Sequence, residues 1–167
     1  MTESPGASIQ TLTDGRLTLK QAHIEWLGWK PDDKDRKVDV SFGPADSILI
    51  HHPDRRRKLV RDLLGERKLA LDSDQNAIEL RLDSVAKTVP VDEQGRMRVP
   101  EEHLRFARLT DKSCRVYVVP RGSNEWLEIW EESKFEDYVR DPSDGWMATL
   151  TRVLQSRQGT PSIPTQT

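Results

Sequence analysis

The feature that most constrains this fold is a short segment that occurs twice. Residues 14–19, Asp-Gly-Arg-Leu-Thr-Leu, return as residues 94–99, Gln-Gly-Arg-Met-Arg-Val, and His23 returns as His103 at the same spacing of 80 residues. A unit repeated inside one small chain predicts a fold made of two related halves. Two halves related by an internal pseudo-two-fold present two similar surfaces. Such surfaces suit a symmetric or extended partner better than a single catalytic cleft does.

The composition limits the class of protein. A chain of 167 residues forms one domain, or two small halves packed as one. Its formal net charge of −2 gives no overall attraction to DNA or to anionic membranes, so any nucleic-acid role needs a local basic cluster. The single cysteine, Cys114, cannot form an internal disulfide, and we interpret it as a small core residue in a reducing compartment. Without a signal peptide or a long apolar run, we expect a cytoplasmic protein.

Alternating polar and apolar residues predict strands, and two of them flank each Gly-Arg turn. Glycine favours such tight turns because it accepts positive φ at little cost. The expected strands are 9–13, 16–19, 38–42, 47–50, 86–91, 96–99, 114–119 and 126–130, with a loop over 120–125. Short helices are expected over 21–27, from Pro53, from Pro100 and over 131–139, the last with Phe135, Tyr138 and Val139 facing inward.

The expected organisation follows from this order. We expect a flexible N-terminus (1–7), a first repeat (8–65), a connecting segment (66–83), a second repeat (84–140), a C-terminal helix (141–155) and a disordered tail (156–167). The four short strands of one half cannot bury a two-sided core alone. The predicted fold is therefore α+β, with two pseudo-symmetric halves that interleave their hairpins into a small barrel or sandwich with flanking helices.

Residues 92–100 carry a family resemblance. Their sequence, Asp-Glu-Gln-Gly-Arg-Met-Arg-Val-Pro, resembles the Asp-x-x-Gly-Arg-x-x-x-Pro signature of the MraZ family, bacterial transcription regulators related to the AbrB swapped-hairpin proteins. The stretch 126–130 and the acidic helix after it are similar to that family too. The resemblance implies AbrB/MraZ-like β-hairpin halves, a ring-shaped homo-oligomer, and sequence-specific binding of double-stranded DNA at an operator with short repeats. It also implies a protein associated with the nucleoid.

The resemblance assigns DNA contacts to the Gly-Arg turns. The family's DNA-binding positions carry over to Gly15, Arg16, Gly95, Arg96 and Asp92, and we add Arg98 on the return strand. Leu12 stands three residues before Gly15, where the signature has aspartate, so the first copy departs from the pattern. The simpler interpretation of Arg96 is a surface arginine that closes its own turn by pairing with Asp92.

Other residues point to chemistry less directly. The basic run 55–58 with Arg61 contributes either phosphate contacts or a solvated helix face. His51 and His52 lack companions at metal-ligand spacing, so we interpret them as strand-end residues. The tryptophans could stack bases, but their apolar surroundings favour a core or a chain–chain interface; they are Trp26, Trp29, Trp126, Trp130 and Trp146.

No motif for a nucleophile, a metal set or a phosphate loop is present, so the sequence predicts neither an enzyme nor a cofactor. Two hypotheses remain. The first is a DNA-binding regulator of the MraZ type. The second is a structural or interaction protein that keeps the oligomer-forming fold without binding DNA, which the near-neutral charge and Leu12 favour.

Overall fold

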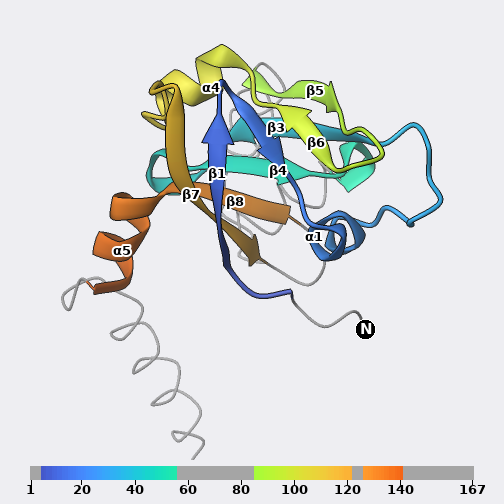
Figure 1. Cartoon of the computed structure of the whole chain (residues 1–167), viewed down its shortest axis with the longest axis horizontal. Coiled ribbons are helices and arrows are strands. Elements are labelled where there is room, and N and C mark those ends of the chain that lie inside the picture. The colour runs from blue at the N-terminus through green and yellow to red at the C-terminus, as the bar shows by residue number, and fades with distance from the viewer. Residues whose placement is uncertain (1–4, 56–84, 122–125, 141–167) are drawn as a thin grey trace, which may run out of the picture. The chain divides into compact units, whose positions relative to one another are not determined.

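The computed structural model describes residues 5–55, 85–121 and 126–140 of the chain (Figure 1). They belong to two units, one that ends at Glu132 and one that begins at Ser133. The strands are β1 (Ser8–Thr13), β2 (Arg16–Thr18), β3 (Lys37–Phe42), β4 (Ile48–His51), β5 (Lys87–Pro90), β6 (Arg96–Arg98), β7 (Ser113–Arg121) and β8 (Trp126–Glu131). The helices are α1 (Gln21–Trp26), α4 (Glu101–Phe106) and α5 (Glu132–Arg140), with the 3-10 turns η1 (Pro44–Asp46) and η2 (Pro53–Arg55).

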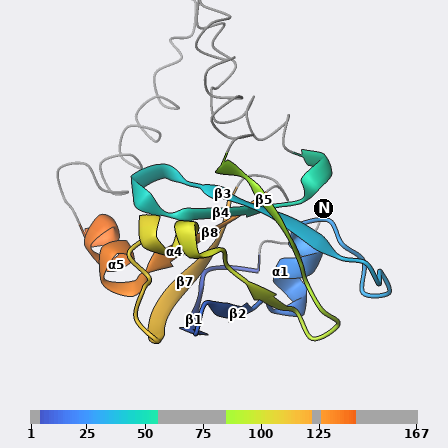
Figure 2. The same ribbon diagram turned by 90° about the horizontal axis from the view of Figure 1, so that it is seen from above.

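All eight strands belong to one antiparallel sheet with the order β5-β3-β4-β8-β7-β1-β2-β6. The two strands at its ends, β5 and β6, follow one another in the chain and are joined by the second Gly-Arg turn. The hairpin that they form lies beside β3 on one side and β2 on the other (Figure 2). The sheet therefore curls into a nearly closed barrel. This confirms the predicted α+β fold of two similar halves, and of the two predicted forms, barrel or sandwich, the structure has the barrel.

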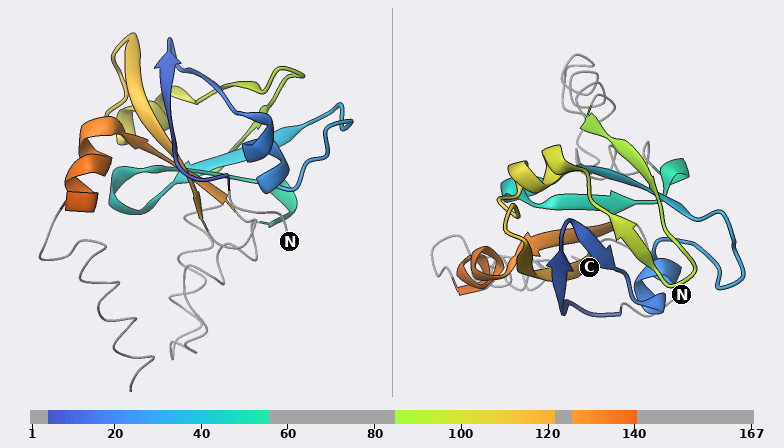
Figure 3. Two further views of the ribbon diagram at one scale, coloured as in Figure 1. Left: turned by 60° about the horizontal axis from the view of Figure 1, so that its bottom comes forward. Right: turned by 45° about the horizontal axis from the view of Figure 1, so that its top comes forward.

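The halves interleave, as predicted. β1 pairs with β7, β2 with β6, β3 with β5 and β4 with β8, so each of these ladders joins one half to the other (Figure 3). The β2–β6 ladder lies on the pseudo-two-fold, with Leu17 opposite Met97 at its centre. This ladder brings the return strands of the two Gly-Arg turns side by side.

Alternation along the strands fills the barrel with aliphatic side chains, because inward positions recur at every second residue. The buried hydrophobic residues include Leu12, Leu17, Val38, Val40, Ile48, Ile50, Val91, Met97, Val116, Val118, Leu127 and Ile129. Trp26 is buried as well, and its Nε1 donates to the carbonyl of Trp126 at 3.2 Å. Trp130 is also buried, so a core position is confirmed for these two tryptophans.

The buried histidines of the two short helices occupy equivalent places. His103 Nε2 lies 2.8 Å from the carbonyl oxygen of Val85, just before β5. His23 interacts with the backbone of Gly6, just before β1. Burial lowers the pKa of both imidazoles. The two histidines of the repeat therefore share a structural place, each beside the segment that leads into the first strand of its half.

Three expectations differ from the structure or lie outside it. β7 continues through Pro120 to Arg121, where a loop was expected; its pairing with β1 ends at Val118, so proline sits at a free strand edge, where it is tolerated. The inward face predicted for α5 is wrong, because none of its residues is buried and Tyr138 is 39% exposed; amphipathic spacing marks an apolar face but not what covers it. Residues 56–84 and 141–167 fall outside the described part.

Candidate nucleic-acid interface

The second Gly-Arg turn is a three-residue hairpin loop. The N–H of Gly95 donates to the carbonyl of Asp92, and the N–H of Asp92 donates to the carbonyl of Arg96, both at 3.0 Å. Gly95 has a φ of +80°, which places this loop among type I turns followed by a bulged glycine. A Cβ on Gly95 would collide with the carbonyl oxygen of Leu19, so both the backbone angle and the space require glycine.

The carboxylate of Asp92 organises this turn and its arginine. Its Oδ1 accepts the N–H groups of Gln94 and Arg96, both at 2.9 Å, and its Oδ2 accepts Arg96 Nε at 2.6 Å. The N–H of Arg96, followed by its guanidinium, holds the pKa of the Asp92 carboxyl below its ordinary value. The Arg96 side chain is still 60% exposed. The predicted Asp92–Arg96 pair is thus present, and it uses the Nε edge of a guanidinium that remains open to solvent.

The first Gly-Arg turn is built differently. Thr13 pairs directly with Arg16, which leaves only Asp14 and Gly15 in the loop, with φ values of +49° and +72°. Positive φ at both central residues is the type I′ hairpin. The side chain of Arg16 is exposed and makes no hydrogen bond or ion pair with another residue of the described segments.

The true counterpart of Leu12 is Val91, not Asp92. Leu12 is fully buried opposite Cys114, while Val91 is 3% exposed and donates its N–H to the carbonyl of Arg36. Both are the last inward residues before their turns. The first turn is therefore one residue shorter, and Thr13 takes the place next to the inward residue that Asp92 takes in the second. The interpretation of Leu12 as a substituted aspartate is wrong, because counting back from the glycine conceals the shorter loop.

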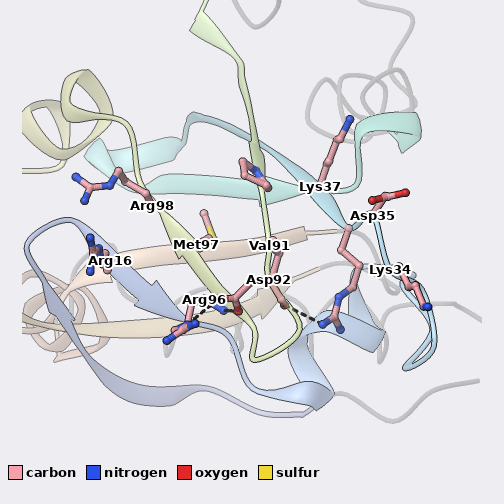
Figure 4. A pocket seen from close by; sticks show the side chains of 11 residues that line it. Arg16, Lys34, Asp35, Lys37, Val91, Asp92, Arg96, Met97 and Arg98 are labelled. Atoms are coloured by element: carbon pink, nitrogen blue, oxygen red, sulfur yellow. Dashed lines mark hydrogen bonds and ion pairs between the residues drawn. The ribbon is translucent and has the colours of Figure 1, made fainter.

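A groove of about 600 Å³ runs beside these turns (Figure 4). Six of its lining residues are basic and two are acidic, although the whole chain carries −2. Arg16 and Arg98, which face each other in the β2–β6 ladder, lie on one side of Arg96, and Lys34 lies on the other. The lining residues are Arg16, Lys34, Asp35, Arg36, Lys37, Pro90, Val91, Asp92, Arg96, Met97 and Arg98.

The groove contains the predicted arginines together with residues that sequence reasoning missed. These residues are Lys34 and Arg36, which precede β3, and Lys37, which begins it. The β3–β5 ladder carries them to the second turn. The signal that could have located them is the repeat itself, because a hairpin swap places the approach to β3 beside the end of β5.

The remaining candidate residues have structural roles in the described segments. His51 is buried 3.3 Å from the hydroxyl of Ser41, and the ring of His52 lies 4.4 Å from that of Trp29. Within residues 5–55, 85–121 and 126–140, no cluster of three or more His, Cys, Asp or Glu residues could hold a metal. No helix in those same ranges is long and apolar enough to cross a membrane. Of the basic run, only Arg55 is described; its guanidinium lies against Gly28.

Comparison with known proteins connects this geometry to a family. Residues 84–156 match the family model described as "MraZ protein, putative antitoxin-like". Over 71 residues the chain is 35% identical to a protein of Moorella thermoacetica named transcriptional regulator MraZ. The aligned region covers 42% of this chain and 46% of the relative. The match thus spans about half of that relative, and the family is not one of enzymes. The second repeat of the chain lies inside the matched region, and this region is similar to the MraZ family.

Proposed function

We propose that this protein is a sequence-specific DNA-binding transcription regulator whose Gly-Arg turns and basic groove contact double-stranded DNA. The observation that carries the proposal is the β2–β6 ladder, in which Arg16 of one half lies opposite Arg98 of the other. That pairing gathers the arginines of both turns on one groove. A chain with a net negative charge thereby gains a local positive surface, which binding to a phosphate backbone requires.

The arrangement supports two kinds of contact. Asp92 binds Arg96 at its Nε, so the two outer nitrogens of the guanidinium are pre-oriented. Such orientation is needed for the two hydrogen bonds that an arginine makes with guanine in the major groove. The side chains of Arg16 and Arg98 are exposed and make no hydrogen bond or ion pair within the described segments, which suits contacts with phosphate oxygens. In this proposal Arg96 supplies more specificity and the other two arginines supply more salt-dependent affinity.

The proposal extends to assembly and organisation. Regions 8–65 and 84–140 act as two repeats of one DNA-facing unit, and chains close into a ring through two different patches that contact each other. Several copies then engage an operator made of short repeats, in the cytoplasm and associated with the nucleoid. Light scattering that finds only monomer across the micromolar range would contradict the ring but leave DNA binding by a single chain open.

The test is fluorescence anisotropy with a duplex from the region upstream of the gene, at several salt concentrations. We expect binding that weakens linearly on a log–log salt plot, by about one unit of slope per lost phosphate contact. Arg16→Ala and Arg96→Ala should both weaken it, while Arg105→Ala, an exposed α4 arginine paired with Glu101, serves as the control.

The alternative function, an interaction protein without DNA contact, is favoured by the net charge of −2. It predicts that oligomers persist while no duplex binds even at low salt. Equal affinity for the upstream duplex and for a scrambled duplex would instead leave DNA binding in place and remove sequence specificity.

A further inference from the structure

Arg36 is an unusual residue in the basic groove, because it is a buried charge. It lies directly before β3 and is 4% exposed. Its Nη2 donates to the carbonyl oxygen of Asp92 at 2.8 Å, while its buried Nε has no hydrogen-bond partner in the described part of the chain. Burying a guanidinium with one nitrogen unpaired is unfavourable, so the contact with Asp92 must be valuable enough to offset that cost.

The carbonyl that Arg36 contacts is central to the second turn. The same oxygen accepts the N–H of Gly95 at 3.0 Å. It therefore has two donors, one that closes the loop from within and one that reaches it from the other half of the barrel. Together they fix the peptide that follows Asp92, and with it the backbone on which the Asp92 carboxylate holds Arg96.

We propose that Arg36 is a positioning residue for Arg96, acting through the backbone and carboxylate of Asp92. Its effect on DNA binding rests on the function proposed above; its effect on the geometry of the turn does not. Because its side chain is buried, Arg36 acts from behind the turn and leaves the contact with DNA to Arg96.

In the described residues, the first half has no equivalent of the hydrogen bond from Arg36 to Asp92. Val91 donates its N–H to the carbonyl of Arg36, and the matching inward residue, Leu12, pairs with Cys114. Cys114 thus occupies the place of Arg36, and its Sγ donates to the carbonyl of Asp111 instead, at 3.4 Å. The shorter type I′ turn beside it bonds to the other half through backbone groups, from the N–H of Val99 to the carbonyl of Gly15 and from the N–H of Asp14 to the carbonyl of Lys112. Arg36 therefore belongs to the longer turn, the one that carries the Asp92–Arg96 pair.

The first experiment needs no DNA. Nuclear magnetic resonance titration measures the pKa of the Asp92 carboxyl in the parent, in Arg36→Met and in Arg36→Lys. The control is Lys34→Met, which removes a positive charge from the same groove without removing a hydrogen bond to the turn. We expect Arg36→Met to raise this pKa clearly more than Lys34→Met does, and Arg36→Lys to restore part of the shift. Equal shifts in the two Met variants would mean that Arg36 acts by charge alone and would overturn the proposal.

The second experiment is a double-mutant cycle on DNA binding, with folding checked by circular dichroism. Arg36→Met should weaken binding severalfold, approaching the loss in Arg96→Ala, and should add little to it in the double variant. Full additivity would show that Arg36 acts independently of Arg96 and would refute the proposal. If Arg36→Met fails to fold, Arg36→Gln, which keeps a polar side chain without the charge, takes its place in both experiments. If the parent binds no duplex, the proposed function fails while the titration still decides the role of Arg36.

Discussion

The two Gly-Arg turns share a dipeptide, but they differ in loop length and in the side-chain contacts of their arginines. The first has two loop residues and an arginine whose side chain has no partner in the described segments, while the second has three loop residues and an arginine whose side chain is bonded to Asp92. Fixing a free arginine on a ligand costs about 2 kcal/mol of side-chain entropy, part of which the Asp92 contact has already removed for Arg96. A sequence repeat thus preserves the position of an arginine without preserving the pre-orientation of its side chain.

Glycine replacement should separate the turns most strongly. Gly95→Ala forces a Cβ against the Leu19 carbonyl at a φ of +80°, whereas a Cβ on Gly15 would meet the Leu104 side chain at 3.1 Å. We expect Gly95→Ala to lower the free energy of unfolding by roughly 3 kcal/mol or more, and Gly15→Ala by about 1–2 kcal/mol. Urea denaturation measures both. Similar losses would show that the two backbones are equally tolerant.

Removing the arginines compares the turns in function. We expect Arg96→Ala to weaken DNA binding by up to about 3 kcal/mol and Arg16→Ala by nearer 1 kcal/mol, because only Arg96 is pre-oriented. Arg16→Ala should also lower the salt slope. Anisotropy at one fixed salt gives the affinities, and a salt series gives the slopes. If Arg96→Ala binds like the parent, the second turn is not the DNA site and the interaction-protein hypothesis replaces the first.

Asp92 should matter for both binding and acid stability. Asp92→Ala frees Arg96 and weakens DNA binding less than Arg96→Ala does, since the charge remains. The pKa of this carboxyl is lowered in the folded state, so its stabilisation is present above the unfolded value of 3.8 and is lost as pH falls through the folded pKa. Asp92→Asn should remove that part of the acid dependence in urea melts from pH 6 to pH 2. An unchanged pH profile would mean that the contact is absent in solution.

The smallest effect should come from the histidines that the two halves share. Burial lowers the pKa of His23 and His103 below 6.5, so the unfolded chain binds more protons than the folded one. Stability should therefore fall as pH drops below 6.5 towards the folded pKa values. His103→Gln and His23→Gln should each flatten part of this slope in urea melts from pH 7.5 to pH 5. A slope that survives in the double variant would have to come from other groups.

The fold could be predicted from the sequence to the extent that local patterns repeat. The alternation around residues 9–19 and 86–99 marked the strands, and the inability of one half to bury its own core predicted the interleaving. The one-residue difference between the turns could not be read, because Leu12 and Asp92 stand at the same distance from their glycines. Burial and strand pairing together show that Leu12 corresponds to Val91.

The sequence predicted some of the residues that line the groove, but not the groove itself. Arg16, Arg96 and Arg98 sit next to the repeated glycines, where a motif could point to them. Arg36 is 56 residues from Asp92, and their contact depends on the β3–β5 ladder. Its neighbours along the chain, Asp35 and Lys37, gave it the appearance of one charge in a solvated loop. A pattern within one segment can be recognised in the sequence, whereas a contact between segments of the two halves cannot.

Two reciprocal hydrogen bonds give the barrel a final property. Leu19 donates its N–H to the carbonyl of Gly95, and Val99 donates its N–H to the carbonyl of Gly15, both at 2.8 Å. Each turn is thus fastened to the residue that leads into the helix of the opposite half. Because Leu19 and Val99 follow the return strands that carry Arg16 and Arg96, each turn is bonded to the strand that leaves the other turn. We therefore expect a displacement of one turn to be transmitted to the return strand of the other.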